Sequence, residues 1–391
     1  MSRIYLDNAA TSWPKPDSVY AAIDHAQRVL GAPAGRGAYY EANDASRIVD
    51  HARNEVAKLI NAPKSRNIAF TFNGTDSLST AILGLLKNGD HVVTTVVEHN
   101  SVLRPLNHLQ GEGLIEVTCV GCDEEGFVDV NEIIASIKPN TRLLVVNHVS
   151  NVTGSIQPVD TLKERLAVLE NQKIVFLLDA AQSLGHIPVD IQELGCDILA
   201  SSGHKGLLGP LGTGLIYLSD RIVNSVNPLR FGGTGTEGSV EFQPEQMPDR
   251  FESGNLNVPG IAGVHAGIRF LNSTEGLELR ARRHANAARL LQGIREIPGV
   301  QIHGAKEMGQ RIGVFSFNIS GWDCHEVASI LDANWAIQTR AGRHCAPLIH
   351  RALGTEPDHG TVRLSVGLFT TLEQADLVLE SIAKLADQSG R

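Results

Sequence analysis

The stretch that decides the fold is Ser201-Ser-Gly-His-Lys-Gly-Leu-Leu-Gly-Pro-Leu-Gly-Thr-Gly214. The β-rich run Ile198–Ser202 leads into it and predicts a strand that delivers Ser202, His204 and Lys205 to a glycine-rich loop. A lysine at a strand end, flanked by small residues, can approach an aldehyde closely, and its amine stays nucleophilic where it is partly desolvated. An ordinary surface lysine beside a turn would have the same local sequence, so the interpretation needs support from the rest of the chain.

Short β-rich runs alternate with helical patterns between residues 66 and 220. This alternation predicts an α/β fold with a mainly parallel, seven-stranded sheet, whose ligands lie beyond the carboxyl ends of the strands. The expected strands are Ile68–Phe72, His91–Val97, Ile115–Val120, Arg142–His148, Lys173–Asp179, Ile198–Ser202 and Gly214–Leu218, and the expected helices are 76–87, 101–110, 130–137 and 158–171.

The pattern changes after about residue 220. Residues 231–238 are glycine-rich and predict a loop, and the rest of the chain predicts a smaller α+β C-terminal domain. Its expected helices are one that runs to 272, then 277–296, 323–333 and 372–387, and its expected strands are 300–303, 312–319 and 361–366. We expect an N-terminal segment (1–15) that packs with the small domain, a large domain (16–255) and a small domain (256–391) that carries Cys345 and Arg363.

Composition excludes several classes of protein. The 391 residues carry a net charge of -9 and no basic stripe, which argues against a nucleic-acid partner. No apolar stretch approaches the ~20 residues that span a bilayer, and the first residues lack the apolar core of a signal peptide. Five scattered cysteines argue against a disulfide framework and for a cytoplasmic protein. Cys119 and Cys122 lack a second pair at zinc spacing, so we expect buried strand residues there and no metal site.

Three further motifs stand at strand ends. Asp179 closes the apolar run Phe176-Leu-Leu-Asp, and pyridoxal phosphate needs such an acid on its ring nitrogen, with Gln182 within reach of the ring oxygen. Thr75 opens a helix after a glycine, as a phosphate site requires, and His99 follows another strand, where an imidazole could stack on the ring. Each alone fits a helix cap or a structural histidine. Together, in chain order, they predict a pyridoxal-phosphate enzyme with the cofactor as a Schiff base on Lys205.

The chain resembles the cysteine desulfurase and selenocysteine lyase family, in the class V aminotransferase group of fold type I (aspartate aminotransferase-like) pyridoxal-phosphate enzymes. The resemblance runs from Tyr5-Leu-Asp-Asn-Ala-Ala-Thr to Arg363-Leu-Ser-Val-Gly, nearly the whole chain. Arg340-Ala-Gly-Arg-His-Cys-Ala-Pro resembles the family motif R-x-G-x-H-C-A, which implies that Cys345 is the sulfur-accepting nucleophile. Only a thiolate attacks well, and the basic residues Arg340, Arg343 and His344 would favour it.

The same resemblance assigns the remaining site residues. Lys205, Cys345 and His99 would be catalytic, and Arg363 would clamp the substrate carboxylate beside Asn151. The cofactor would be bound by Gly74, Thr75, Asp76, His99, Asn151, Asp179, Gln182, Ser202, His204, Lys205 and Asn255. The implied reaction converts L-cysteine to L-alanine and leaves a persulfide on Cys345. A short loop cannot carry that sulfur far, so we expect a separate acceptor protein or small thiol. A homodimer is also expected, because family sites borrow loops such as 231–238 and 250–256 from the partner.

Three positions depart from the family pattern: Asn255 and Asp76 stand where threonine is usual, and Tyr39 stands where many members have histidine. These departures leave the substrate open. A selenocysteine lyase, a lyase for another cysteine conjugate or a class V aminotransferase would share most of the motifs. A non-catalytic relative that serves as a binding partner in sulfur trafficking is disfavoured by the intact Lys205, Asp179 and Arg363.

Overall fold

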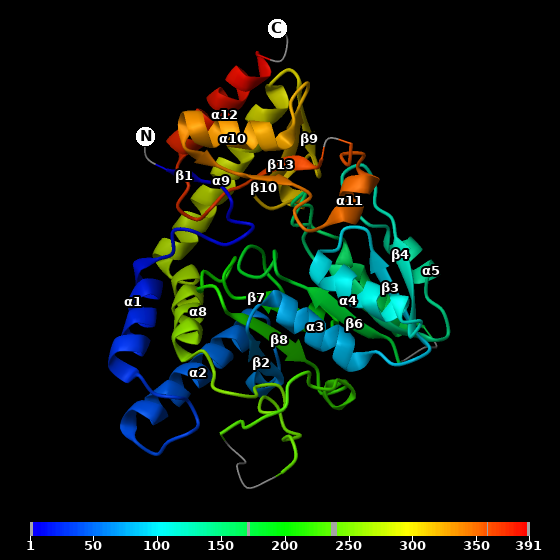
Figure 1. Cartoon of the computed structure of the whole chain (residues 1–391), viewed down its shortest axis with the longest axis vertical. Helices are drawn as coiled ribbons and strands as arrows, with labels where there is room; N and C mark the ends of the chain where they lie inside the picture. Colours follow the sequence, from blue (N-terminus) through cyan, green and yellow to red (C-terminus); the bar gives the residue numbers. More distant parts are fainter. Residues whose placement is uncertain (1–2, 170–172, 236–240, 358, 389–391) are drawn as a thin grey trace.

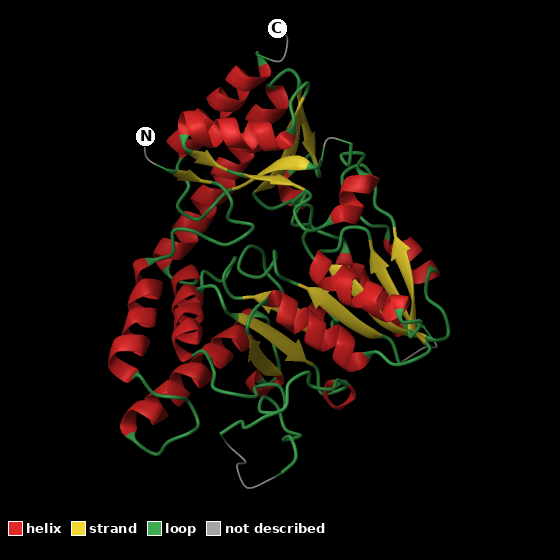
Figure 2. Ribbon diagram, in the orientation of Figure 1, coloured by secondary structure: helices red, strands yellow, loops and turns green. Residues whose placement is uncertain are grey.

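The computed structural model describes residues 3–169, 173–235, 241–357 and 359–388. In the view of Figure 1 a large body with a central sheet lies below, and a smaller body with a second sheet lies above it. Figure 2 shows helices on the faces of both sheets. The prediction of an α/β protein with a mainly parallel sheet is confirmed.

The larger sheet has seven strands in the order β2-β8-β7-β6-β5-β3-β4. All neighbouring pairs are parallel except those made by β8, which is antiparallel to both β2 and β7. The strands are β2 (Ile68–Thr71), β3 (Asp90–Thr95), β4 (Ile115–Val120), β5 (Thr141–Asn147), β6 (Val175–Asp179), β7 (Ile198–Ser202) and β8 (Gly214–Leu218).

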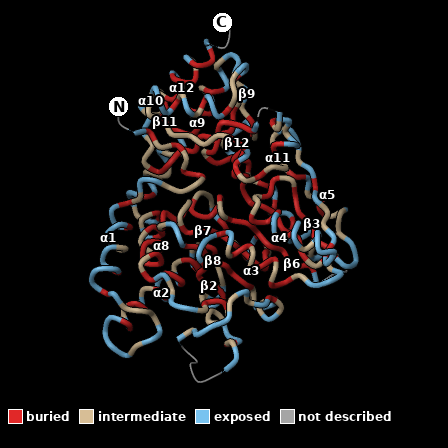
Figure 3. The backbone as a smooth tube through the Cα atoms, in the orientation of Figure 1, coloured by how far each residue is buried: buried red, intermediate tan, exposed pale blue. Residues whose placement is uncertain are grey.

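The central strands are buried because helices cover both faces of the sheet. Every residue of β6 and β7 is buried, as the red core of Figure 3 shows. Successive side chains of a strand point to opposite faces. In β5, Leu144 and Val146 therefore join one hydrophobic cluster, whereas Leu143 and Val145 join the other. A parallel sheet buried on both faces needs such continuous apolar runs, which is why these strands could be recognised in the sequence.

The helices alternate with these strands and continue into the smaller body. They are α1 (Asp17–His25), α2 (Tyr40–Leu59), α3 (Gly74–Leu85), α4 (Asn100–Gly111), α5 (Val130–Ala135), α6 (Leu162–Ala167), α7 (Ile191–Leu194), α8 (Val258–Leu271), α9 (Thr274–Glu296), α10 (Cys324–Trp335), α11 (Pro347–Ala352) and α12 (Leu372–Ala386). Short 3₁₀ or π turns are η1 (Ala26–Leu30), η2 (Ser65–Asn67), η3 (Val159–Thr161), η4 (Val223–Ser225) and η5 (Met308–Gln310).

The smaller body contains an antiparallel sheet in the order β12-β13-β10-β9. Its strands are β9 (Val300–His303), β10 (Val314–Ile319), β12 (Arg340–Gly342) and β13 (Thr361–Ser365), and side chains of α9, α10 and α12 share its core. The N-terminal strand β1 (Ile4–Tyr5) pairs in parallel with β11 (Ile337–Gln338). Helix α8 packs against α1 and α2 in the large body. The division of the chain at residues 15 and 255 stays a prediction.

Two local expectations were wrong. Cys119 is exposed, because β4 is the edge strand among the described strands of the sheet, and Cys122, two residues beyond the end of β4, is only partly buried. The helix expected at 158–171 is shorter: it begins as η3 and continues as α6, and residues 170–172 lie outside the described part of the chain. Within the described residues no helix has both the length and the apolar character to cross a bilayer.

Candidate active site

The predicted site residues meet at the carboxyl ends of the parallel strands. β7 ends at Ser202, just before His204 and Lys205, and β6 ends at Asp179, whose Cα partner on β5 is Asn147. Helix α3 starts with Gly74 directly after β2, and α4 starts after His99 at the end of β3. Ligands in open α/β sheets bind at this edge.

One cavity of about 210 Å³ joins these strand ends to the small sheet above them. Ten of the predicted site residues line it: Gly74, Thr75, His99, Asn151, Asp179, Gln182, Ser202, His204, Lys205 and Arg363. It is also lined by Ala9, Ala10, Asn73, Leu78, Ser101, Asn147, Ala181, Arg340 and His344. The sequence-based grouping of residues from six segments therefore corresponds to one physical space.

The polar lining of this cavity fits a bound, highly polar molecule. A buried polar atom without a hydrogen-bond partner costs about 1–3 kcal/mol, so such atoms are normally rare. Within the described part of the chain, seven lining residues each have one: Asn147 Oδ1, Asn151 Oδ1, Gln182 Oε1, Ser202 Oγ, His204 Nδ1, His344 Nδ1 and Arg363 Nε. A phosphate, a ring hydroxyl and a substrate carboxylate would supply the missing partners, as pyridoxal phosphate and an amino acid do.

Lys205 has the properties of a reactive amine. Burial lowers its pKa to about 8, and Arg363 and Arg340 act in the same direction, whereas Asp179 raises it. Burial in turn raises the pKa of Asp179, against the opposing effects of Lys205 and of the Ala181 N–H, which donates to Oδ1 at 2.9 Å. A carboxylate in this position gains most from a cationic partner, such as a protonated pyridine nitrogen.

His99 lines the cavity and is a neutral ring. Its Nδ1 caps helix α4 by accepting from the Ser101 N–H at 3.0 Å. Burial and the nearby Lys205, Arg340 and Arg363 lower the pKa of His99 to about 4. In the neutral ring the proton must then lie on Nε2, because Nδ1 is the acceptor.

Glu98, next to His99, is a fully buried acid. Its Oε1 accepts from Thr95 Oγ1 at 2.8 Å and from the Asn147 N–H at 2.9 Å, whereas Oε2 has no partner among the described residues. Burial raises its pKa to about 8, from 4.5 for a free side chain. The side chain is therefore neutral at pH 7 and a carboxylate only above about pH 8.

We expect Glu98→Gln to change how the stability of the cofactor-free protein depends on pH. Between pH 4.5 and 8 the native protein keeps a proton on Glu98 that the unfolded chain releases, so wild-type stability falls as pH rises through this range. Glutamine has no such proton, so the free energy of unfolding of the variant should rise relative to that of the wild type by on the order of 4 kcal/mol between pH 5 and pH 8.5. Urea unfolding at both values measures this. The exposed Glu132→Gln is the control, and an equal pH slope for Glu98→Gln and wild type would contradict the assignment.

Two arginines form the roof of the cavity. Arg340 on β12 and Arg363 on β13 are direct partners in the antiparallel register. Arg363 is 1% exposed, donates from Nη1 to the Asn151 carbonyl at 3.0 Å and binds Asp7 Oδ1 through Nη2 at 2.7 Å. Like charges directly opposite each other repel, so an anionic group between them is favoured. The pair suits the carboxylate of an amino acid.

Cys345 lies beside this roof in a short, fixed turn between β12 and α11. Arg340 Nη2 lies 3.2 Å from its Sγ. The carbonyl of His344 accepts from Asn151 Nδ2 and that of Cys345 from the Asn100 N–H, both at 2.7 Å. His344 and Cys345 also have left-handed backbones, with φ of 48° and 60°, at a cost of roughly 1–2 kcal/mol per residue for a non-glycine residue. These contacts hold the thiol in one place.

The surroundings of the thiol differ from the expectation in one respect. Arg340 contacts Sγ as predicted, but Arg343 lies 3.9 Å from Glu356, and burial holds the pKa of His344 well below its usual range. His344 is therefore neutral and adds no positive charge. The sequence could not reveal this, because the burial of a side chain in a turn depends on the tertiary structure.

Two other predicted cofactor residues do not line the cavity. The carboxylate of Asp76 pairs with Arg230 and accepts from the Phe72 N–H, and its own N–H donates to Asn73 Oδ1 at 2.9 Å. Asn255 lines a separate, small cavity of about 30 Å³ that also contains Phe72 and Arg230. Both lie at the same edge of the large sheet as α3. A role for either in binding a cofactor stays a prediction.

Sequence reasoning missed several residues that shape the site. The N-terminal segment closes it: Gln182 Nε2 donates to the Ala9 carbonyl at 2.8 Å, and Ser12 donates from its N–H to the His204 carbonyl at 3.1 Å. Ser101 was also missed, although a serine two residues after a helix-capping histidine is a local signal. No local signal marks Ala9, because its contact is made across the fold.

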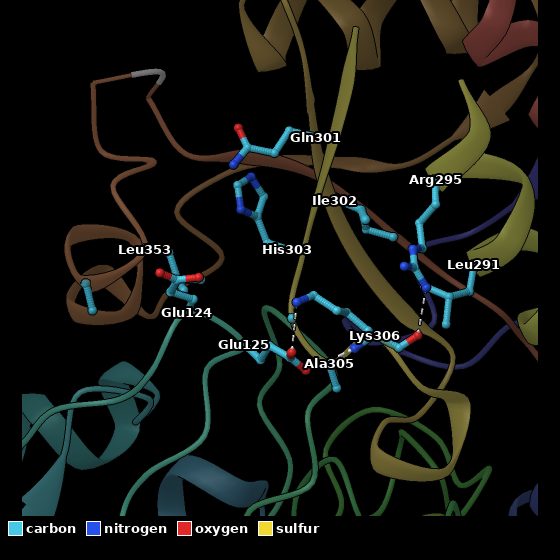
Figure 4. Close-up of a pocket in the computed structure, with 12 residues that line it drawn as sticks. Glu124, Glu125, Leu291, Arg295, Gln301, Ile302, His303, Ala305, Lys306 and Leu353 are labelled. Carbon is cyan, nitrogen blue, oxygen red and sulfur yellow. Dashed lines mark hydrogen bonds and ion pairs between the residues drawn. The ribbon is translucent and has the colours of Figure 1, made fainter. Parts of the chain in front are cut away.

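A larger cavity of about 410 Å³ lies elsewhere, between β9, α9 and the loop with Glu124 and Glu125 (Figure 4). Some of its charged groups already have partners: Lys306 Nζ is 3.3 Å from Glu125 Oε1, and Arg295 donates to the Lys306 carbonyl at 3.2 Å. None of the predicted site residues is among the described residues that line it. The smaller cavity is therefore the candidate active site.

Comparisons with known proteins agree with this geometry. The family model described as aminotransferase class-V matches residues 4–378. A probable cysteine desulfurase of Methanothermobacter thermautotrophicus is 36% identical over 394 residues, 98% of this chain and 94% of that relative. The apo structure of a cysteine desulfurase from Thermococcus onnurineus NA1 is 34% identical with a TM-score of 0.89, over 99% of this chain and 95% of that one. An Escherichia coli cysteine desulfurase, solved as the S-sulfonic acid, is 25% identical with a TM-score of 0.86 and the same coverage.

Proposed function

We propose that Cys345 takes the sulfur of L-cysteine as a persulfide, since the chain belongs to the class V aminotransferase family and is a pyridoxal-phosphate-dependent cysteine desulfurase. One observation carries the proposal. The Cys345 thiol does not itself line the cavity, but it lies 3.2 Å from Nη2 of Arg340, which lines it together with Lys205, and it is close enough to Lys205 for their charges to interact. The sulfur acceptor and the cofactor lysine then belong to one site.

The residues present fit the cofactor and its substrate. Bound pyridoxal phosphate supplies an electron sink next to the substrate Cα. Asp179 would hold the ring nitrogen, and His99 would stack on the ring. Polar groups at the start of α3 and the end of β7 would hold the phosphate, namely the backbone N–H groups of Gly74 and Thr75 together with Ser202 and His204. Arg363, with Asn151 beside it, would hold the carboxylate of the amino acid.

The chemistry of the chain's own groups follows from their states. Lys205, whose pKa is lowered to about 8, can take the Cα proton as a neutral amine. The Cys345 thiolate attacks the substrate sulfur, an S–S bond forms as the C–S bond breaks, and the substrate carbon keeps the electron pair. His99, which lines the cavity, would then donate its Nε2–H proton to that carbon. The net result is that a thiol and L-cysteine become a persulfide and L-alanine.

The fixed turn supports a separate sulfur acceptor. Both carbonyls at Cys345 and His344 are tied to the large body, and only residues 343–346 separate β12 from α11. A persulfide on this turn cannot travel, so an acceptor protein or small thiol must reach it.

The test of the proposed function is the release of alanine and sulfide from L-cysteine. With dithiothreitol, which reduces the persulfide, the two products should form in equal amounts. Without dithiothreitol, a burst of about one alanine per Cys345 should precede a much slower rate, because the covalent intermediate accumulates and excess L-cysteine is then the remaining thiol acceptor. No alanine from a yellow, cofactor-loaded enzyme would refute L-cysteine as the substrate, and the same rate with and without dithiothreitol, with no burst, would refute a fixed persulfide.

Arg363→Lys is expected to raise KM for L-cysteine about 10- to 100-fold, with a smaller effect on kcat. The lysine keeps the charge but loses the planar fork, and a hydrogen bond to a charged group is worth about 1.5–3 kcal/mol. Steady-state alanine formation measures this. Arg343→Lys is the matched control, since Arg343 is about half exposed and pairs with Glu356. An unchanged KM for Arg363→Lys would place the carboxylate elsewhere.

A cytoplasmic homodimer is the remaining part of the proposal. All five cysteines are unpaired, which suits a reducing compartment. Large apolar side chains are exposed near the Asn255 cavity and on the adjoining loops, with Phe72 52%, Phe231 71% and Phe242 82% exposed. A second copy of the chain would cover them. Light scattering after gel filtration tests this, and a monomer at micromolar concentration would contradict it.

A further inference from the structure

Ser101 connects the two sides of the candidate site. Its Oγ lies 2.8 Å from His99 Nδ1 and 2.7 Å from Thr75 Oγ1, while its backbone N–H donates to the same Nδ1 at 3.0 Å. Ser101 is buried, with 7% of its surface exposed, whereas Thr75 is exposed. A continuous row of hydroxyl and imidazole groups therefore runs from exposed Thr75 to His99, and all three residues line the cavity.

This row constrains how His99 can handle protons. Because a backbone N–H can only donate, Nδ1 is an acceptor and Nε2 carries the ring proton. Nε2–H can give its proton to the cavity but cannot take one up. Unless Nδ1 gains a proton in the same event, the ring would become an anion. Ser101 Oγ is the hydroxyl in contact with Nδ1 and can deliver that proton.

The charges around His99 disfavour a protonated imidazolium ring, and so favour a mechanism in which His99 loses one proton and gains another in the same event. The charged groups that act on it are Lys205, Arg340, Arg363 and Arg104, all positive, and burial adds to their effect on its pKa, which is about 4. A lasting imidazolium would lack a carboxylate partner. A hydroxyl relay avoids this state, because each atom loses one proton as it gains another.

We propose that Ser101 is the positioning residue that makes His99 a proton donor, by relaying protons from exposed Thr75 to Nδ1. In each event Nε2–H passes to the substrate carbon, Ser101 Oγ–H passes to Nδ1, Thr75 Oγ–H passes to Ser101, and a water molecule restores Thr75 and leaves hydroxide. Both hydroxyls are regenerated, and the ring keeps one proton, now on Nδ1. In the reset, Nε2 takes a proton from solvent in the cavity while Nδ1 returns one along the row to the hydroxide, so one solvent proton has moved to the product. The identity of the product rests on the proposed function, whereas the hydrogen bonds that define the relay are independent of it.

The first test is independent of cofactor and turnover. In cofactor-free protein labelled with ¹⁵N-histidine, Ser101→Ala should move the His99 Nδ1 resonance toward that of a ring nitrogen without a hydroxyl donor. Ser101→Thr restores the hydroxyl and should restore the resonance. An Nδ1 resonance that is the same in wild type and Ser101→Ala would overturn the relay, whether or not L-cysteine is the substrate.

The second test uses the loaded enzyme. Ser101→Ala should lower kcat for alanine formation about 10- to 100-fold, the scale of general acid catalysis, with KM and cofactor affinity nearly unchanged. The rate is also measured as the fraction of D₂O in the solvent is raised. For the wild type and Ser101→Thr, this dependence should show that more than one proton moves in the step. For Ser101→Ala it should show only one. Full activity of Ser101→Ala beside an active wild type would overturn the relay and leave the desulfurase function intact. A loss of cofactor affinity that Ser101→Thr does not restore would make Ser101 merely structural.

Discussion

Cys345→Ser is expected to abolish the formation of both alanine and sulfide from L-cysteine. A serine hydroxyl at this position is protonated and forms no persulfide, so the sulfur has no acceptor. The loss should be on the order of 10³-fold or more, as when a covalent nucleophile is removed from other enzymes. The Lys205 site is untouched, so the variant should keep its cofactor and its yellow colour.

The comparison with other cysteines makes this result specific. Cys119→Ser changes an exposed thiol on β4 and should keep full activity, and the assay measures alanine and sulfide in parallel for the two variants. If Cys345→Ser formed alanine at the wild-type rate, the enzyme would be an aminotransferase or a lyase that does not use this thiol. Retained activity with selenocysteine alone would identify a selenocysteine lyase.

Lys205→Ala is the second change with a large expected effect. The variant loses the group that holds the cofactor covalently and takes the Cα proton, so activity should fall by about 10⁴-fold, the upper range for a general base. Its absorbance should lack the band of the lysine-bound cofactor, and a small primary amine added to the buffer should restore part of the rate.

A neighbouring lysine provides a demanding control. Burial lowers the pKa of Lys15 to about 8 as well, so its amine is as readily deprotonated as that of Lys205. Lys15 Nζ, however, donates to Ser12 and does not line the cavity. After borohydride reduction, mass spectrometry should find the cofactor on the peptide with Lys205. Cofactor on Lys15, or full activity of Lys205→Ala, would refute the assignment.

The sequence predicts the strand ends well for a physical reason. Strands β4, β7 and β8 have the predicted bounds. The reason is that a strand can be recognised from its local sequence alone, as a β-rich run that ends at turn residues. Since parallel strands end at one edge, placing Asp179 and Lys205 at strand ends was enough to bring them together.

Other features depend on contacts across the fold and were not predictable. The pairing of Arg340 with Arg363 is set by the register of β12 and β13, and β12 is too short to have a pattern of its own. The left-handed backbone of Cys345 is unusual for a residue that is not glycine. The exposure of Cys119 follows from the edge position of β4, and strand order cannot be seen in a local run of residues.

The pairing of β1 with β11 has a consequence for how the protein is made. Ile4 and Ile337 are partners, so 333 residues must be synthesised after Ile4 before the first strand can find its neighbour. At the usual rates of translation this takes on the order of 20 to 70 s. By the end of that interval all strands of the large sheet have been synthesised, whereas the first strand, just before the segment that closes over Gln182 and His204, has had no strand to join. The catalytic pocket is therefore among the last parts of the molecule to mature.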